Sequence, residues 1–205
     1  MKNSKTDLKR NLTMYYQTPF KGLSKRQLVE LGLQNALKFL EINGLPVPNI
    51  TIHEHSNPKG FCGLCDYSSK RIQVWVPDVA YVSFNPIPGQ RRWSYPGYKI
   101  DRTGVGVISH EIGHWVDYCV KLHRGFPKKG KITGYEPNIY ESVAESMRLF
   151  ILNPCLLHII ASERCEYIVK SGLKPVVTED WDKVLENAPA EYSRQILKNY
   201  LGFHC

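Results

Sequence analysis

Two histidines and a glutamate within five residues have the types and the spacing of a hydrolytic metal site. The stretch reads His110-Glu111-Ile112-Gly113-His114, which is the H-E-x-x-H pattern. Histidines four residues apart lie on one face of an α-helix, so both imidazoles can bind one zinc ion at about 2.0–2.1 Å. Glu111 is then placed to hold and deprotonate a metal-bound water. The pattern predicts one catalytic Zn²⁺ with His110 and His114 as ligands.

The helix that must carry this motif is predicted for about residues 103–122. Apolar residues recur at spacings of four, three, four and three, at Ile108, Ile112, Trp115, Cys119 and Leu122. His110, His114 and Asp117 form a polar line beside this apolar stripe. We expect one face of the helix to pack and another to present ligands. The alternative is an ordinary amphipathic helix with two exposed histidines.

A catalytic zinc site needs a third protein ligand, and its fourth position stays open for water. The elongated motif with a histidine six residues past His114 is absent, because position 120 is a valine. Glu141 and Glu145 lie four residues apart on a second predicted helix, so one can bind the metal while the other orients a ligating histidine. Asn138-x-x-Glu141 is also a capping-box pattern, so Glu141 can instead close the start of its own helix. A glutamate pair on an exposed face is the other alternative.

The resemblance of this chain to a known family rests on two motifs within residues 103–152. They read His110-Glu111-x-Gly113-His114-x-x-Asp117 and Glu141-x-x-Ala144-Glu145-Ser146-x-Arg148. The pair resembles gluzincin-type zinc metallopeptidases and is similar to anthrax lethal-factor-like peptidases and zincin domains of phages and toxins. The resemblance implies that Glu141 is the third zinc ligand and that Glu145 supports a ligating histidine, with Asp117 in the same supporting role. It also implies an α+β zincin-like fold: an N-terminal helix, a small twisted mixed sheet, the active-site helix, the glutamate helix and a helical C-terminal part.

Relatives of this type also place a tyrosine at the oxyanion, a few residues before the third ligand. Tyr135 lies six residues before Glu141 and Tyr140 directly precedes it, so either tyrosine is a candidate. The expected activity is that of a zinc metalloendopeptidase with Glu111 as general base. Two other functions stay open. One is a catalytically silent zincin-fold structural or interaction protein, for example a phage structural component, and the other is a basic nucleic-acid-binding module.

Periodicity and turn residues predict the elements that precede the motif helix. A capping box at 24–27 begins a helix that Asn43-Gly44 ends, and strands are predicted at 49–55, 61–67 and 71–76. The third strand is the candidate for pairing with an extended peptide substrate, through Ile72, Gln73, Val74 and Trp75. Residues 77–102 are predicted to form a long aromatic-rich loop that either covers the entrance of the site or packs beneath the motif helix.

His53, His55, Cys62 and Cys65 offer the ligand types of a second metal or redox site. On a β-strand, residues three apart point to opposite faces, which separates Cys62 from Cys65 unless the chain turns there. The alternative interpretation is two cysteines on a strand pair in which Gly63 marks a bulge.

Length and composition indicate a globular protein. The chain has 205 residues and a net charge of +8, with a basic arm predicted at 1–20 and one domain at 21–205, of which 153–205 is a helical extension. A basic surface can attract nucleic acid, and that partner stays possible although no motif supports it. The resemblance to metallopeptidases implies a protein or peptide substrate. The six cysteines, without an apolar leader or a membrane-length apolar run, predict reduced thiols and a cytoplasmic location, or a virion or host cytoplasm for a phage-encoded protein.

Overall fold

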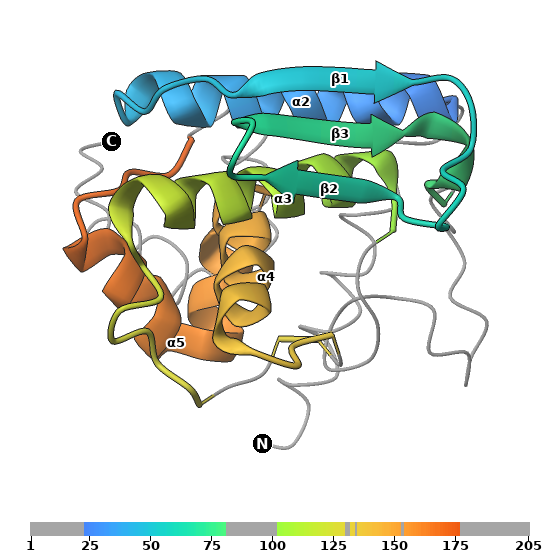
Figure 1. The fold of residues 1–205 in the computed structure, drawn as a ribbon. Helices are drawn as coiled ribbons and strands as arrows, with labels where there is room; N and C mark the ends of the chain where they lie inside the picture. The colour runs from blue at the N-terminus through green and yellow to red at the C-terminus, as the bar shows by residue number, and fades with distance from the viewer. Residues whose placement is uncertain (1–22, 81–101, 130–131, 134, 153, 177–205) are drawn as a thin grey trace, which may run out of the picture. The chain divides into compact units, whose positions relative to one another are not determined.

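The computed structural model of the protein describes residues 23–80, 102–129, 132–133, 135–152 and 154–176 (Figure 1). These residues form four α-helices and one three-stranded mixed sheet, which confirms the predicted α+β class. The predicted arm at 1–20 and nearly all of the predicted loop at 77–102 lie outside the described residues, as does the C-terminal part of the predicted extension. None of the helices among the described residues is both long and apolar enough to span a membrane.

Helix α2 spans Lys25–Ile42 and begins at the predicted capping box. The Ser24 hydroxyl accepts from the Gln27 backbone N–H at 3.2 Å, and the Gln27 side chain accepts from the Ser24 N–H at 2.8 Å. Its buried face includes Leu28, Ala36 and Phe39, which pack toward the rest of the core. The chain leaves the helix through Gly44 at φ +60°, a conformation that glycine adopts without strain.

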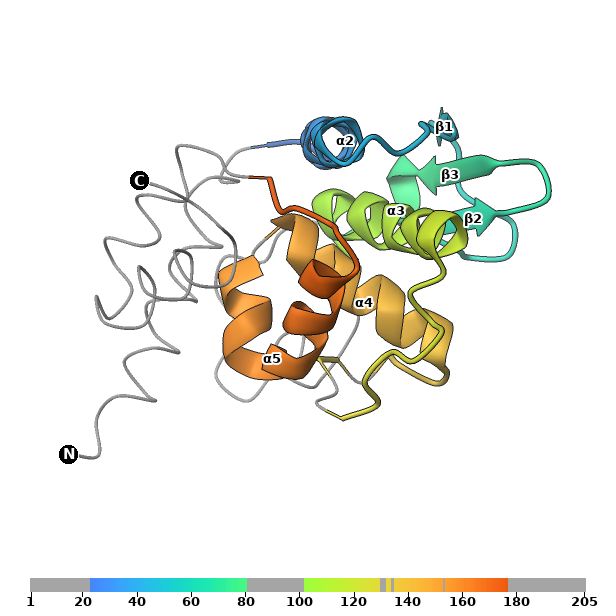
Figure 2. The same cartoon turned by 90° about the vertical axis from the view of Figure 1, so that its left-hand side faces the viewer.

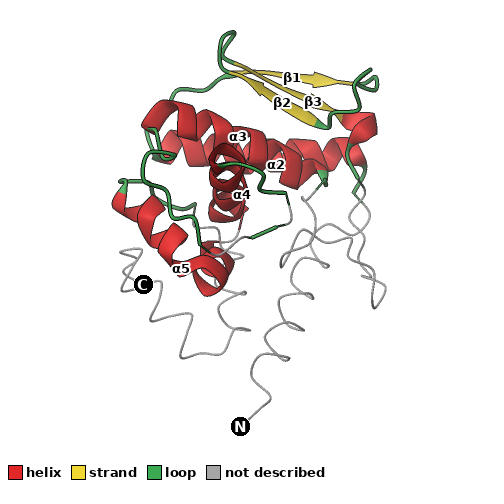
Figure 3. Ribbon diagram, turned by 60° about the horizontal axis from the view of Figure 1, so that its bottom comes forward, coloured by secondary structure: helices red, strands yellow, loops and turns green. Residues whose placement is uncertain are grey.

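The sheet consists of β1 (Asn49–His53), β2 (Gly63–Asp66) and β3 (Arg71–Trp75), each shorter than its predicted strand. The strand order is β1-β3-β2, with β1 parallel and β2 antiparallel to β3. Figure 3 shows α2 and the motif helix α3 (Gly104–Val120) together on one side of this sheet. A short 3-10 helix, η1 (Val76–Asp78), follows β3.

The position of β3 contradicts the predicted substrate-binding strand. Its residues Ile72, Gln73, Val74 and Trp75 are paired on both sides, with β1 at one edge and β2 at the other. Ile72 and Val74 are also fully buried. The prediction is wrong because a middle strand has no free backbone donors or acceptors left for another chain. Within the described part of the chain, the free edge nearest to the motif helix belongs to β2.

The motif helix α3 spans Gly104–Val120, with the Thr103 hydroxyl accepting from the Gly106 N–H at 3.1 Å. Every residue from Gly104 to Asp117 is buried, so the ligand-presenting face is packed as well as the apolar stripe, and the alternative of two exposed histidines is wrong. The ligand-bearing face is covered by helix α4 (Ile139–Leu152), which packs across it (Figure 2). Helix α5 (Pro154–Lys170), kinked at Ala161, packs against α4 in turn.

The close approach of α3 and α4 depends on a glycine inside the motif. A Cβ atom on Gly113 would lie 2.9 Å from the Ala144 carbonyl oxygen and 2.9 Å from the Met147 Cβ. No side chain fits in that space without separating the helices. The missing side chain therefore lets the glutamate helix reach the two histidines, which flank Gly113 on the helix surface.

Candidate metal centre

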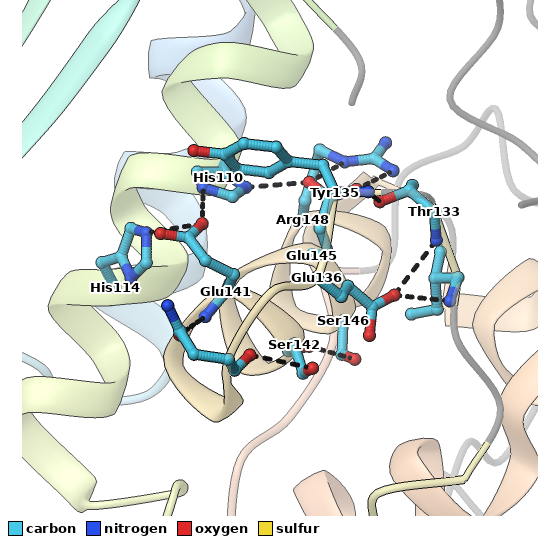
Figure 4. A network of polar contacts seen from close by, with 12 residues as sticks. His110, His114, Thr133, Tyr135, Glu136, Glu141, Ser142, Glu145, Ser146 and Arg148 are labelled. Atoms are coloured by element: carbon cyan, nitrogen blue, oxygen red, sulfur yellow. Dashed lines mark hydrogen bonds and ion pairs between the residues drawn. The ribbon is translucent and has the colours of Figure 1, made fainter. Parts of the chain in front are cut away.

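The side chains of His110, His114 and Glu141 converge between α3 and α4 (Figure 4). Glu141 Oε2 lies 3.1 Å from His110 Nε2 and 3.4 Å from His114 Nε2, and all three candidate ligand atoms lie within 4.8 Å of one another. The two histidines are 3% and 9% exposed. We call these three residues the helix-borne cluster. It is the one group of three or more potential metal ligands found among the described residues.

The donor set and its spacing fit a zinc ion. Ligands at about 2.0–2.1 Å from a tetrahedral zinc are roughly 3.3 Å from each other, which the 3.1 and 3.4 Å separations approach. Two imidazoles and one carboxylate are also the combination that leaves a fourth position open. The helix-borne cluster could therefore hold one metal ion, and its donor types suit zinc.

The start of α4 resolves the two structural interpretations of Glu141. The Asn138 side chain accepts from the Glu141 backbone N–H at 3.0 Å, so the helix cap is present. The Glu141 carboxylate, however, lies against the two histidines, with Oε2 within hydrogen-bond distance of His110 Nε2. Its backbone takes part in the cap, and its side chain belongs to the cluster.

Glu145 and Arg148 support the cluster from behind. Glu145 Oε1 lies 2.8 Å from His110 Nδ1, which leaves His110 Nε2 directed at the cluster. Arg148 donates to both Glu145 oxygens, from Nε at 3.2 Å and from Nη2 at 3.1 Å, and both side chains are buried. Burial opposes the charge on Glu145, but the Arg148 cation and His110 outweigh it and lower the pKa of Glu145 to about 2. This carboxylate is a fixed negative charge behind His110.

The Nδ1 atoms of the two histidines differ in their surroundings: Glu145 lies against that of His110 but not against that of His114. Burial disfavours a charged His110, but its contacts with Glu141 and Glu145 outweigh burial and raise the pKa of His110 to about 10. His114 Nδ1 is buried, and within the described residues it has no hydrogen-bond partner. Of the two histidines, His110 is the one whose orientation is fixed by a buried carboxylate.

The two glutamates nearest to the histidines have opposite pKa shifts. Burial raises the pKa of Glu111 despite the attraction of His110 and His114. For Glu141, burial acts in the same upward direction, but the hydrogen bonds to both histidines lower its pKa to about 2. A carboxylate with a low pKa suits a metal ligand, and one with a raised pKa suits proton transfer near neutral pH.

Strand β2 fixes the side chain of Glu111. The Cys65 backbone N–H donates to the Glu111 carboxylate. A Cβ atom on Gly63 would lie 2.6 Å from Glu111 Oε1, so the glycine gives the carboxylate its space against the strand. Glu111 is therefore held between its own helix and the edge of the sheet.

Of the two candidate tyrosines, Tyr135 lies beside the cluster. Its ring centroid is 6.1 Å from that of His110, in a tilted arrangement, and the residue is 43% exposed (Figure 4). The Tyr140 ring instead lies against His123, with centroids 5.1 Å apart. Burial raises the pKa of Tyr135, with further contributions from Glu141 and Glu111, so the phenol stays protonated and can donate.

A buried ion pair holds the turn that carries Tyr135. Glu136 accepts from the backbone N–H groups of Ile132 and Thr133, at 2.6 and 3.0 Å, and from Arg164 Nη1 at 2.8 Å. Arg164 reaches it from α5 and also donates to the Lys129 carbonyl at 3.0 Å. This pair is not predictable from local sequence patterns, because 28 residues separate its members and neither belongs to a local motif.

Asp117 does not support a histidine of the cluster. Its carboxylate accepts from the His123 backbone N–H at 2.7 Å and lies 3.0 Å from His123 Nδ1. The Lys121 N–H donates to the Asp117 carbonyl, and Lys121 has a left-handed conformation at φ 62°. Asp117 thus fixes the turn that ends α3, which corrects its predicted supporting role.

The predicted second metal site is not formed. We call its four residues, His53, His55, Cys62 and Cys65, the strand-borne cluster. His53 stacks on Trp75 with ring centroids 5.0 Å apart, and the Cys62 thiol donates to the Asp78 carbonyl at 3.1 Å. Cys65 lies on β2 beside Glu111, and burial followed by the nearby acidic groups raises its pKa to about 12. A thiol that stays protonated is a poor metal ligand, and the search of the described residues groups none of the four into a metal site.

Comparison of this chain with protein-family models, with curated proteins and with solved structures finds no match. The side chains of the site therefore provide the basis for inferring a function.

Proposed function

We propose that this protein is a zinc-dependent peptidase of the gluzincin type with a zincin-like fold. The observation that carries the proposal is the convergence of His110, His114 and Glu141 next to a fourth residue, Glu111, with a raised pKa. A structural zinc site closes all of its positions with protein ligands, whereas three ligands and an adjacent carboxylate are typical of catalysis. The α+β arrangement, with both motif helices beneath a small mixed sheet, is compatible with this family.

Each polar residue of the site then has a defined task. Zinc, when bound, supplies a Lewis acid that polarises a carbonyl and lowers the pKa of water. Glu111 accepts a proton from the attacking water and donates it to the leaving amine, for which its raised pKa is suited. The Tyr135 phenol, protonated and close to His110, donates to the oxyanion that develops on the substrate.

The edge of β2 is the best place for an extended peptide. The Cys62 carbonyl accepts from the Trp75 N–H at 3.0 Å, so residues 62, 64 and 66 direct their backbone groups toward β3. The backbone groups of Gly63 and Cys65 consequently point to the outer edge, which agrees with the hydrogen bond from Cys65 to Glu111. A peptide that pairs with this edge lies beside the general base.

The test is cleavage of a diverse peptide library by the zinc-loaded full chain, followed by mass spectrometry. Glu111→Gln should retain zinc and lose about 10²–10⁴-fold in kcat/KM, because it removes only the proton acceptor. The matched control is Glu166→Gln, which changes the same residue type in an ion pair with Lys170 on α5 and should leave the rate unchanged.

Two outcomes would count against the proposal. A Glu111→Gln variant with undiminished cleavage would exclude the assigned general base. Stoichiometric zinc binding by the wild-type chain without cleavage of any peptide would favour the silent structural protein instead.

A further inference from the structure

Three aromatic side chains form a stack next to the helix-borne cluster. Tyr67 and Tyr118 stack with ring centroids 5.4 Å apart at 13°, and Trp115 stacks on Tyr118 at 5.4 Å and 24°. Trp115 is 3% exposed, and its indole N–H donates to the Pro46 carbonyl at 2.7 Å. The two tyrosines are each 37% exposed. We call these three residues the aromatic ledge: the tryptophan anchors it in the core, and the tyrosines offer ring surface to solvent.

The aromatic ledge continues directly from the proposed catalytic site. Tyr118 is four residues past His114 on α3, so the two side chains lie one above the other on the same helical face. Tyr67 follows the last residue of β2, the strand whose other end lies against Glu111. Burial raises the pKa of Tyr67, and the nearby acidic groups, Glu111 and Glu141 among them, add to the shift. A peptide along β2 that reaches Glu111 would therefore pass the ledge.

The composition of the ledge selects the kind of side chain that it can hold. The Tyr67 ring, which ends the stack and belongs to a residue that is 37% exposed, can bind another ring by offset stacking, which adds to the burial of apolar area. Lys121 Nζ lies 4.4 Å from the Tyr118 ring centroid, so a positive charge is already present at the ring. That charge disfavours a lysine or arginine side chain in the same place. A neutral aromatic side chain is the best occupant.

We propose that the aromatic ledge binds an aromatic side chain of the peptide substrate and thereby sets the cleavage specificity. The inference rests on the proposed peptidase function and names the substrate class of that site. The substrate side chain would be a phenylalanine, tyrosine or tryptophan at one fixed position relative to the scissile bond. Since ring stacking is present before and during the reaction, the ledge should act mainly on KM and little on kcat.

The first arm of the test is the cleavage-site profile of the wild-type protein and of ledge variants. Wild type should prefer phenylalanine over alanine at one position by roughly tenfold in kcat/KM, the size expected for one ring contact. Tyr67→Ala should abolish most of that preference, and Tyr67→Phe, which keeps the ring, should retain it. Tyr118→Leu is the second variant, and zinc content and thermal melting verify that each variant folds.

The second arm measures binding without turnover. A labelled peptide with one phenylalanine and its alanine analogue are titrated into zinc-loaded Glu111→Gln protein, with and without Tyr67→Ala, by fluorescence anisotropy. The ledge is supported if the phenylalanine peptide binds more tightly than its alanine analogue and Tyr67→Ala abolishes that difference. This result would support the ledge even if wild type cleaves nothing and the proposed activity fails. Equal binding of both peptides, or cleavage without an aromatic preference, would contradict the role proposed for the aromatic ledge. Neither result would contradict the peptidase activity, which is tested by the separate cleavage experiment.

Discussion

The helix-borne and strand-borne clusters contain similar ligand types, but among the described residues the fold brings only the helix-borne ligands together. In the first cluster, a spacing of four residues on α3 puts His110 and His114 on one face, and α4 brings Glu141 to within 3.4 Å of both. In the second cluster, His53 and His55 contact each other with ring centroids 5.1 Å apart, but His53 also stacks on Trp75 and the Cys62 thiol donates to the Asp78 carbonyl.

The difference shows what a metal site requires beyond ligand-type residues. Helical spacing of four fixes two ligands by local geometry alone, whereas alternation along a strand separates residues three apart. The third ligand depends on a second element at contact distance, which Gly113 permits here. Packing also sets the charge of the neighbouring groups. Arg148 behind His110 keeps Glu145 negatively charged, whereas burial beside Glu111 keeps the Cys65 thiol protonated.

The largest expected effect is the loss of the zinc site on removal of a ligand. His110→Ala should lower zinc affinity by more than about 100-fold, because changes to residues that merely support ligands already cost up to that amount. Equilibrium dialysis followed by elemental analysis measures it. His55→Ala, a histidine of the strand-borne cluster, is the matched control and should keep its zinc. Full zinc content in His110→Ala would show that the cluster is not the metal site.

A smaller effect is expected from the carboxylate behind His110. Glu145→Gln should reduce zinc affinity by about 10–100-fold, because it removes the charge that orients and polarises the imidazole. The same change breaks the buried ion pair between Glu145 and Arg148, so the free energy of unfolding should fall by up to about 3–5 kcal/mol. Competition with a chelating dye and urea denaturation measure the two quantities. An unchanged zinc affinity would remove Glu145 from the account of the site.

The pH dependence of zinc binding should report the raised pKa of His110. In the metal-free protein this pKa is about 10, so His110 is protonated at neutral pH and must lose its proton when zinc binds. Zinc affinity should therefore rise roughly tenfold per pH unit between about pH 7 and 8.5. The carboxylates of Glu141 and Glu145, with pKa values lowered to about 2, stay charged in this range and add no dependence. A flat profile above pH 7.5 would contradict this assignment, and calorimetry in buffers of different ionisation enthalpy counts the released proton.

The smallest effect is expected from the strand-borne cluster. A triple variant with His53→Ala, Cys62→Ser and Cys65→Ser should retain its zinc, with an affinity within about twofold of wild type, because these side chains contribute no ligand. The same dialysis assay applies. A large loss of zinc in this variant would show that the strand-borne cluster contributes metal ligands, contrary to the comparison between the two clusters.

Local patterns predicted the parts of this fold that local geometry controls. The capping box at Ser24, the length of α2 and the placement of two histidines on one helical face all follow from neighbouring residues. The identity of the middle strand does not, because it depends on β2 and β1 pairing with opposite edges of β3. The apolar stripe on α3 likewise gave no sign that α4 buries its ligand-bearing face as well.

The residues that hold the site in position are harder to predict from the sequence than the metal ligands themselves. Glu145 follows Glu141 by one helical turn, so its role was visible in the sequence. The pairing of Glu136 with Arg164, which holds the turn of Tyr135, joins two elements without any shared motif. The supporting role predicted for Asp117 is wrong because its position on the helix, close to His114, does not reveal the turn at Lys121. That turn brings His123 to the Asp117 carboxylate.

The coordination of zinc in the purified full chain tests the central claim most directly. X-ray absorption spectroscopy at the zinc edge measures the type and distance of the ligands. The account predicts about one zinc per chain, with two imidazole nitrogens and oxygen ligands at about 2.0–2.2 Å and no sulfur. A sulfur shell at about 2.3 Å, or protein that takes up no stoichiometric zinc, would contradict it.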